Sequence, residues 1–355
     1  MTKIQDSSQN IGLNRSKSDP LVGAKNGCSL DTLAQLGKND KNPPKNGAFL
    51  NDENDRKRYE KRAKAKFLTN SYLYKLIDLK SDLKDSYWST YHCASYLESQ
   101  SQDGNNKLIC KYCNQRWCLV CNRIRIAKAI NGYSKPLSNL EDKQFVTLTN
   151  KNCKGHELRD RIDLMLKMDS NNRCSMRKMG MKIKGVRKLE CTYNPFTDDF
   201  NPHFHFIVDS KEKAESLING WLKLNRKHNI KVSEKAQHFV ECDNNSMMEL
   251  FKYFTKIVSS KGDEKRHTTA SALDAIFQAM KGKRVYQPIG GLRKIQVSED
   301  VEDIRAETVS QSIANMGNWL WSINDWYAME SGGENLCGYQ PSEYDKEYGK
   351  MIRNK

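Results

Sequence analysis

The sequence predicts an α+β fold in which helices flank an antiparallel sheet, together with a small cysteine-rich, metal-binding subdomain. Apolar runs rich in β-branched and aromatic residues predict strands at residues 145–149, 186–193, 202–208 and 236–242. A turn-rich segment, 194–202, joins two of these strands into a hairpin. Apolar residues at helical spacing predict helices at residues 156–168 and 211–225. Five of the 11 cysteines fall between residues 93 and 121, which predicts the separate subdomain.

The composition favours a polyanionic partner. The chain has 59 lysines and arginines against 43 acidic residues, and its net charge of +16 suits nucleic acid because each phosphate contact releases counterions. The same charge also fits a solvated basic surface. No stretch approaches the roughly 18 apolar residues that cross a bilayer. The polar start Met1–Asp6 has no apolar signal core, so we expect a cytoplasmic protein with no membrane partner.

Four cysteines are spaced like metal ligands. Cys110, Cys113, Cys118 and Cys121 supply four thiolates within 12 residues, a spacing typical of tetrahedral Zn²⁺. A four-iron cluster is the alternative. Six further cysteines are scattered singly, which indicates a reducing compartment rather than a disulfide framework.

Two histidines lie one residue apart in the apolar run 202–208. In a strand, residues i and i+2 point to one face, so His203 and His205 can bind one ion while Phe204 and Phe206 enter the core. Glu190 on the partner strand of the hairpin is the candidate third ligand. A carboxylate beside two imidazoles suits Mg²⁺ or Mn²⁺. The alternative is that Glu190 is an exposed strand residue.

A helix starting near Ser246 carries three polar side chains on one stripe. At 100° per residue, Glu249, Tyr253 and Lys256 fall on a side separate from the apolar residues. Such a stripe is typical of an active face. The alternative is structural: Ser246 and Glu249 fit a capping box, and Tyr253 borders the core.

The order of these motifs resembles that of a known family. A strand, a His-hydrophobe-His strand and a tyrosine helix follow one another in the bacterial rolling-circle plasmid replication initiators (Rep), members of the His-hydrophobe-His endonuclease superfamily. The pair Glu249 and Tyr253 is similar to the subtype with one tyrosine and one glutamate. Further resemblance lies in residues 145–155, in residues 186–193 with Pro202–His205, and in Met280–Arg284 with Gly290 and Gly291. It covers residues 85–296.

The resemblance implies DNA nicking by transesterification. Tyr253 would attack the scissile phosphate, leaving a 5′-phosphotyrosine and a free 3′ hydroxyl. Glu249 would activate the water that ends replication. Lys256 would lower the pKa of the tyrosine or hold a phosphate, or else only solvate the helix. The implied partners are plasmid origin DNA, single-stranded or extruded from the duplex, and a host helicase and DNA polymerase.

The resemblance also changes the expected zinc ligands. The Rep pattern is matched best by Cys93, Cys113, Cys118 and Cys121, with Cys110 as the substitute. We expect this structural site to brace four basic residues against DNA, namely Arg116, Arg123, Arg125 and Lys128.

Five segments follow from these predictions. They are a disordered polar arm at residues 1–55, a basic helical segment at 56–84, the zinc-binding subdomain at 85–135, the endonuclease domain at 140–296, and a helical tail at 297–355. Two other functions stay open. One is a non-catalytic zinc-dependent DNA-binding regulator, and the other is a transposase with the same nicking chemistry.

Overall fold

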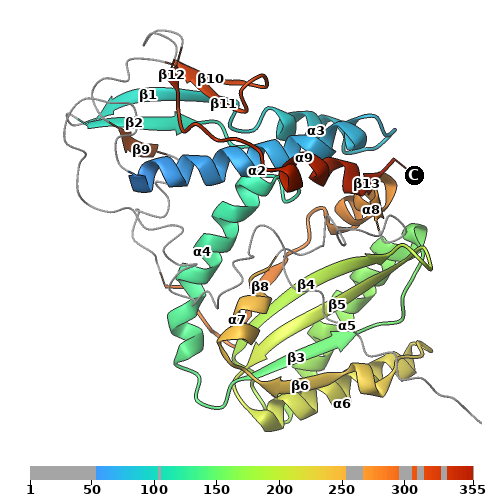
Figure 1. The fold of residues 1–355 in the computed structure, drawn as a ribbon. Helices are drawn as coiled ribbons and strands as arrows, with labels where there is room; N and C mark the ends of the chain where they lie inside the picture. Colours follow the sequence, from blue (N-terminus) through green and yellow to red (C-terminus); the bar gives the residue numbers. More distant parts are fainter. Residues whose placement is uncertain are drawn as a thin grey trace, which may run out of the picture.

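The computed structural model describes residues 53–102, 105–252, 267–295, 306–309, 316–328 and 334–354. These residues form two lobes (Figure 1). One lobe contains a five-stranded sheet, and the other contains a six-stranded sheet with helices α2 (Glu53–Ile77) and α3 (Lys84–Tyr91). Helix α4 (Leu119–Ser138) runs from one lobe to the other. The polar arm predicted for residues 1–55 lies outside the described residues except for its last three.

The five-stranded sheet confirms the predicted antiparallel architecture. Its strand order is β6-β3-β5-β4-β8, and every neighbouring pair is antiparallel. The strands are β3 (Gln144–Thr149), β4 (Gly185–Asn194), β5 (Asp199–Val208), β6 (His238–Glu241) and β8 (Tyr286–Ile289). The sequence predicts the first four. Strand β8 was missed because it is short and contains Pro288, which fits only an edge position.

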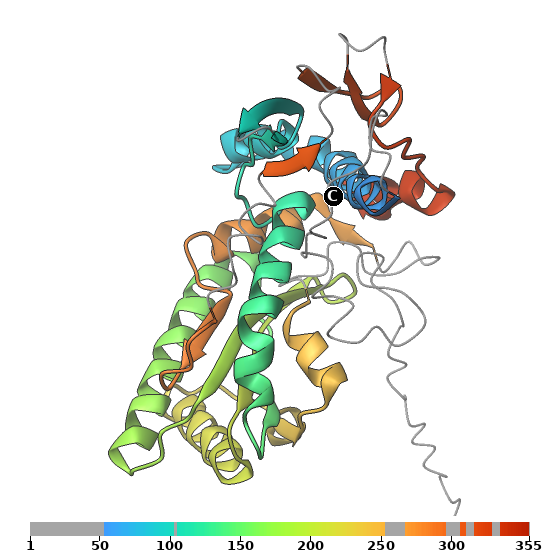
Figure 2. The ribbon, with the colours of Figure 1, turned by 90° about the vertical axis from the view of Figure 1, so that its left-hand side faces the viewer.

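Helices flank this sheet, as the fold class predicts, and they cover both of its faces (Figure 2). Helices α5 (Leu158–Lys178) and α6 (Lys211–Lys227) pack on one face, where the Phe204 and Trp221 rings meet edge to face at 5.8 Å between centroids. Helix α4 and helix α7 (Asn244–Leu250) pack on the other face, against Phe145 and Ile207. Because strand residues alternate, His203 and His205 point to this second face.

The six-stranded sheet corrects the prediction of a helical C-terminal tail. Its order is β12-β11-β10-β1-β2-β9, entirely antiparallel. The strands are β1 (Tyr96–Gln102), β2 (Asn105–Cys110), β9 (Ala306–Val309), β10 (Met316–Leu320), β11 (Asp325–Ala328) and β12 (Glu334–Asn335). Within the described part of the tail, the only α-helix is α9 (Glu343–Tyr348). The prediction is wrong because β10 gains its stability from pairing with β1, more than 200 residues earlier in the chain.

Aromatic packing holds the two lobes together. Helix α8 (Ala270–Met280) lies between them, and its Phe277 contacts Trp117, which precedes α4, and Tyr87 of α3. The parallel pair β7 (Thr268–Thr269) and β13 (Ile352–Arg353) joins the C-terminus to the start of α8. This arrangement places α8 between α2 and the five-stranded sheet (Figure 1).

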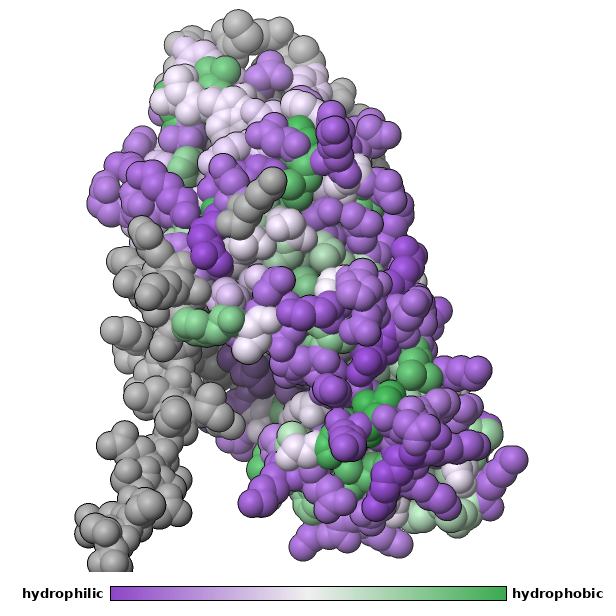
Figure 3. All heavy atoms as spheres, turned by 90° about the vertical axis from the view of Figure 1, so that its right-hand side faces the viewer, coloured by the Kyte–Doolittle hydropathy of each residue, from purple (hydrophilic) through white to green (hydrophobic). Residues whose placement is uncertain are grey.

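The basic segment 56–84 is helical as predicted, but part of its charge faces inward. Arg62 and Lys66 of α2 are 8% and 1% exposed. The face of the molecule drawn in Figure 3 is mainly hydrophilic, with apolar side chains in small groups. Among the described helices, none combines the length and apolar composition that a bilayer crossing requires.

Candidate metal centres

The first candidate metal centre lies on the hairpin β4–β5. Glu190 and His203 are direct cross-strand neighbours, and His205 is two residues further along β5 on the same face. The Nε2 atoms of His203 and His205 lie 4.0 Å and 3.8 Å from the two carboxylate oxygens of Glu190. Possible ligand atoms of the three residues all lie within 4.8 Å of one another. The structure therefore brings together the three predicted ligands.

The Nδ1 atom of each imidazole has a hydrogen-bonding partner of its own. His203 Nδ1 lies 2.9 Å from the carbonyl oxygen of Asn201, and His205 Nδ1 lies 3.2 Å from Thr147 Oγ1. The Phe145 ring stacks on His205 at 5.1 Å between centroids. Hydrogen bonds of this kind fix the orientation of a metal-binding histidine. Both Nε2 atoms are thereby directed towards Glu190.

The Glu190 carboxyl and the His205 imidazole have suitable protonation states for metal binding at neutral pH. Burial raises the pKa of Glu190, but the charges of Lys188, His203 and His205 outweigh it and bring the pKa to about 2. Burial and then the neighbouring His203 lower the pKa of His205 to about 3. An ionised carboxylate beside a neutral imidazole is what a divalent cation requires. The three-residue set is thus compatible with a metal, and it leaves coordination positions for other ligands.

Lys188 is a site residue that the sequence did not reveal. Its side chain is fully buried, and Nζ lies 2.6 Å from Glu190 Oε2 and 3.3 Å from the carbonyl oxygen of Glu249. It therefore joins the carboxylate of the candidate centre to the last turn of α7. The signal available beforehand was its position two residues before Glu190 on the same strand face. From the sequence alone, a lysine at this position could equally face solvent. Its burial becomes evident only once α7 is seen to cover this face of the strand.

Helix α7 begins earlier than predicted. Asp243 is its N-cap, and Asp243 Oδ1 accepts a hydrogen bond of 2.7 Å from the Ser246 backbone N–H. The capping box formed by Ser246 and Glu249 is therefore wrong. Glu249 is 43% exposed and forms an ion pair with Lys252. Tyr253 and Lys256 lie outside the described residues.

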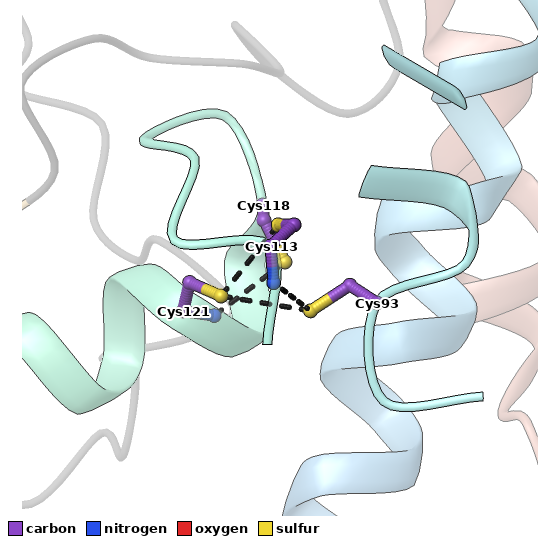
Figure 4. A group of neighbouring side chains, drawn as sticks. All are labelled: Cys93, Cys113, Cys118 and Cys121. Carbon is purple, nitrogen blue, oxygen red and sulfur yellow. Dashed lines mark hydrogen bonds between the residues drawn. The ribbon is translucent and has the colours of Figure 1, made fainter. Parts of the chain in front are cut away.

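The second candidate metal centre consists of Cys93, Cys113, Cys118 and Cys121 (Figure 4). Cys93 Sγ and Cys121 Sγ are 3.5 Å apart, and Cys113 Sγ and Cys121 Sγ are 3.6 Å apart. Zinc–sulfur bonds of about 2.3 Å at the tetrahedral angle separate two sulfurs by about 3.8 Å. The four thiols therefore fit a tetrahedral Zn²⁺. Cys110, the substitute ligand, is not a member of this group.

Backbone N–H groups support the thiolate form of these cysteines. Cys113 N donates to Cys93 Sγ, Gln115 N donates to Cys113 Sγ, and Cys121 N donates to Cys118 Sγ, at 3.4–3.5 Å. Cys118 is also the N-cap of α4, where the helix dipole favours negative charge. Contacts with the other three thiols, Cys118 first, lower the pKa of Cys113, whereas contact with Cys113 raises the pKa of Cys93 and burial raises that of Cys118.

A buried lysine accompanies this centre as well. Lys66 Nζ donates to the carbonyl oxygen of Cys93 at 2.7 Å and to Ser95 Oγ at 2.8 Å. Burial lowers the pKa of Lys66 to about 8, while Cys93 and Cys118 act in the opposite direction. Four thiolates around Zn²⁺ carry net negative charge, and the ammonium group of Lys66 is placed to offset it.

The four basic residues predicted to contact DNA lie next to this centre. Arg116 is in the loop before α4, and Arg123, Arg125 and Lys128 are on α4 itself. All four are partly exposed. Arg116 Nη1 donates to the carbonyl oxygen of Met280 at 3.0 Å, which links this loop to the end of α8.

Comparison with known proteins places this arrangement in a family. Residues 107–318 match the family described as replication protein, which is well over half of the 355 residues. The chain belongs to this family of replication proteins. The matched region contains both metal-centre hairpin strands and three of the four grouped cysteines. The subtype with one tyrosine and one glutamate stays a prediction.

A curated relative agrees with this assignment. "Protein rep" of Staphylococcus aureus is 35% identical over 102 residues. These residues are 27% of this chain and 44% of that protein, so less than half of the relative is covered. No solved structure gives a significant match.

Proposed function

We propose that this replication protein initiates rolling-circle replication of a plasmid by nicking one strand of the origin. The observation that carries the proposal is the Glu190, His203 and His205 group, whose two Nε2 atoms face one ionised carboxylate. A DNA-binding protein without catalytic activity has no use for such a centre. The family assignment and the similarity to a Staphylococcus aureus "Protein rep" support a role in replication.

The donor set suits Mg²⁺ or Mn²⁺, which would withdraw charge from the scissile phosphate when bound. The residues around it keep the ligands in position. Asn201 and Thr147 orient the two imidazoles, and Lys188 holds Glu190 while contacting the last turn of α7. The end of α7 therefore lies beside the metal face, which supports a nucleophile from the segment that follows it.

Tyr253, three residues after the end of α7, is the proposed nucleophile. Its phenol oxygen attacks phosphorus, the bond from phosphorus to the 3′ oxygen breaks, and the phenol proton is lost to solvent. The 3′ oxygen takes up a proton, so the products are a 5′-phosphotyrosine and a 3′ hydroxyl. The phosphodiester energy is kept in the covalent bond for later strand joining. Lys256 is proposed to favour the phenolate or to hold a phosphate.

Glu249 is proposed to activate the water that hydrolyses the DNA at termination. Its carboxylate is half-exposed at the end of α7 and is paired with Lys252. A single tyrosine and a glutamate allow one cycle of nicking followed by release. This role differs from that of Glu190, whose carboxylate is held by Lys188 at the base of the centre.

The four-cysteine centre is proposed to bind a structural Zn²⁺ through Cys93, Cys113, Cys118 and Cys121. It would hold the loop and helix that carry Arg116, Arg123, Arg125 and Lys128 against origin DNA. We propose the segments 85–135 and 140–296 as zinc-binding subdomain and endonuclease domain. A host helicase and DNA polymerase would use the open strand and the 3′ hydroxyl, in the bacterial cytoplasm.

The deciding experiment uses the full chain with single-stranded origin DNA carrying a 3′ or 5′ label. With Mn²⁺ or Mg²⁺, we expect a protein–DNA adduct that resists denaturation. It should retain the DNA on the 3′ side of the break, so the 3′ label stays with the protein and the 5′ label is released. Tyr253→Phe keeps the aromatic ring and should abolish both the adduct and nicking. Tyr74→Phe, at an exposed position on α2, is the matched control and should form the adduct.

Other outcomes would replace this proposal. Binding without cleavage under every metal condition would favour the DNA-binding regulator. Joining of the nicked strand to an unrelated DNA would favour a transposase. An adduct that persists in Tyr253→Phe would show that another group is the nucleophile.

A further inference from the structure

A cavity lies where the zinc-binding loop meets the end of α8. It is lined by residues 114–117, by Arg125 of α4 and by residues 280–282, and its volume is about 190 Å³. The first segment directly follows Cys113 of the four-cysteine group, and the last belongs to the Met280–Arg284 motif. Neither the nicking chemistry nor the zinc site uses this motif. The cavity therefore joins two parts of the chain that the proposed function leaves unconnected.

The wall of the cavity is cationic. Arg116, Arg125 and Lys281 contribute positive charge, and no acidic residue lines it. No ion pair with a carboxylate is found for these three residues within the described part of the chain. Burial and then the charge of Arg125 lower the pKa of Arg116. Two guanidinium groups held near each other without a counterion are a typical binding site for an oxyanion.

Two hydrogen-bond donors of the lining residues lack acceptors. Arg125 Nη1 and Trp117 Nε1 are both buried, and neither has a partner among the described residues. Leaving a buried donor unpaired costs about 1–3 kcal/mol. A ligand rich in acceptors and poor in donors would satisfy them. Arg116 and the other Nη atom of Arg125 are already held by the carbonyl oxygens of Met280 and Asn114, so the donors are fixed in place.

We propose that this cavity binds a backbone phosphate of the DNA strand. The inference rests on the proposed function, because it takes DNA as the ligand. Phosphate supplies acceptor oxygens and negative charge together, which matches the orphan donors and the uncompensated cations. The four-cysteine centre keeps the loop 114–117 in position, and the end of α8 closes the other side. The strand would therefore be held at the junction of the two lobes.

The test measures the affinity of the full chain for a labelled single-stranded oligonucleotide across a range of salt concentrations, with no Mg²⁺ or Mn²⁺ added. Each phosphate contact on a single strand contributes about 0.7 to the slope of log K against log salt. We expect the double variant Arg125→Gln with Lys281→Gln to lose about that much slope and to bind about tenfold more weakly. Lys227→Gln, an exposed lysine at the end of α6, is the matched control and should match the wild type.

A second arm locates the phosphate. Oligonucleotides that carry one neutral methylphosphonate linkage, moved along the strand, should show one position that weakens wild-type binding most. In the double variant, the same linkage should cause no further loss of affinity. Lys281→Gln alone should show part of the effect with unchanged zinc content and melting temperature, which separates lost contact from a disturbed loop.

Three results would overturn the inference. The first is a wild-type salt slope in the double variant, the second is an equal loss of slope in Lys227→Gln, and the third is the same effect of every methylphosphonate linkage in both proteins. A last measurement compares the melting temperatures of the wild type and the double variant with inorganic phosphate added. If phosphate raises only that of the wild type while both proteins bind DNA equally, the cavity binds free phosphate and not DNA. Since no divalent metal is added, failure of nicking by Tyr253 leaves this measurement unaffected.

Discussion

The two candidate metal centres differ in how they are built. The cysteine centre takes its four thiols from a turn after α3, a loop and the start of α4, and four thiolates complete a tetrahedral shell. The Glu190, His203 and His205 centre takes three ligands from two adjacent strands and leaves positions open. A closed centre that joins separate segments stabilises a fold. An open centre on a preformed hairpin serves chemistry.

Each centre contains a buried lysine, and the two lysines act differently. Lys66 donates to the backbone carbonyl of Cys93 and does not contact a ligand atom through a hydrogen bond. Lys188 contacts Glu190 Oε2, which is itself one of the candidate ligand oxygens. Lys66 is thus compatible with a metal that stays bound permanently. Lys188 holds its carboxylate ionised and in place whether or not a cation is present.

The largest expected effect concerns the closed centre. Cys121→Ser or Cys118→Ser should remove the zinc and unfold the lobe that contains α2 and α3, because structural zinc contributes on the order of 10 kcal/mol to small domains. Metal analysis and thermal melts by circular dichroism would measure this. Cys110→Ser is the matched control and should keep about one zinc per chain. Equal losses in Cys110→Ser, with none in Cys93→Ser, would contradict the assigned ligands.

The open centre should behave in the opposite way. Replacing His203 and His205 together by Ala should abolish nicking, while duplex binding and zinc content stay at wild-type levels because those contacts lie elsewhere. Gel assays of nicking and binding on the same protein test this. His228→Ala, at the exposed end of α6, should nick normally. Full cleavage by the double variant would refute the metal assignment.

Lys188, the buried lysine of the open centre, should contribute most to the free energy of unfolding when no cation is present. Lys188→Met leaves the Glu190 carboxylate buried without its partner and should lower the free energy of unfolding by about 3 kcal/mol. Denaturant melts measure this change. Mn²⁺ should stabilise Lys188→Met more than the wild type, because the cation takes over the missing positive charge.

Lys184→Met is the control for this prediction. Lys184 precedes β4 and is exposed, so its loss should change stability by less than about 0.5 kcal/mol. If Mn²⁺ stabilised all three proteins equally, Lys188 and the cation would not share one site.

Acidification should also distinguish the open centre. The folded pKa of His205 is about 3, well below the ordinary value of 6.5. As pH falls below 6.5, the unfolded chain binds a proton that folded His205 does not, so stability should fall by up to about 1.4 kcal/mol per pH unit. Urea melts between pH 6.5 and 5, without added Mg²⁺ or Mn²⁺, give the free energy of unfolding at each pH. This free energy should change less steeply with pH in His205→Asn than in the wild type. An unchanged slope would mean that His205 is protonated in the folded protein.

The smallest expected effect concerns α7, where Asp243 is the N-cap and Glu249 is the proposed catalytic residue. Asp243→Ala removes the observed N-cap and should cost about 1 kcal/mol. Glu249→Ala should leave the melting temperature nearly unchanged, since its ion pair with Lys252 is half-exposed. It should still form the DNA adduct but fail to release DNA by hydrolysis. Normal release by Glu249→Ala would remove that residue from the proposed termination step.

Local patterns predicted much of the lobe that contains the five-stranded sheet. The alternation of His203, Phe204, His205 and Phe206 was enough to assign one face to ligands and the other to the core, and the hairpin turn brought Glu190 opposite His203. The cap of α7 was misplaced by three residues, because Asp243 and Ser246 are both good caps and only the backbone geometry distinguishes them. The helical tail was wrong because its strands pair with β1, far away in the sequence.

The sequence by itself therefore determined the strands and helices of the five-stranded sheet, its two-faced hairpin and the set of thiols available to a metal. These features depend on the spacing of neighbouring residues, which a strand or helix converts directly into position. The family resemblance implied which four thiols meet, and the tertiary structure brings these four together. Only the tertiary structure decided that Lys66 and Lys188 turn inward and that residues 114–117 form one cavity with residues 280–282. Those features depend on burial and on contacts between distant segments, which local spacing does not specify.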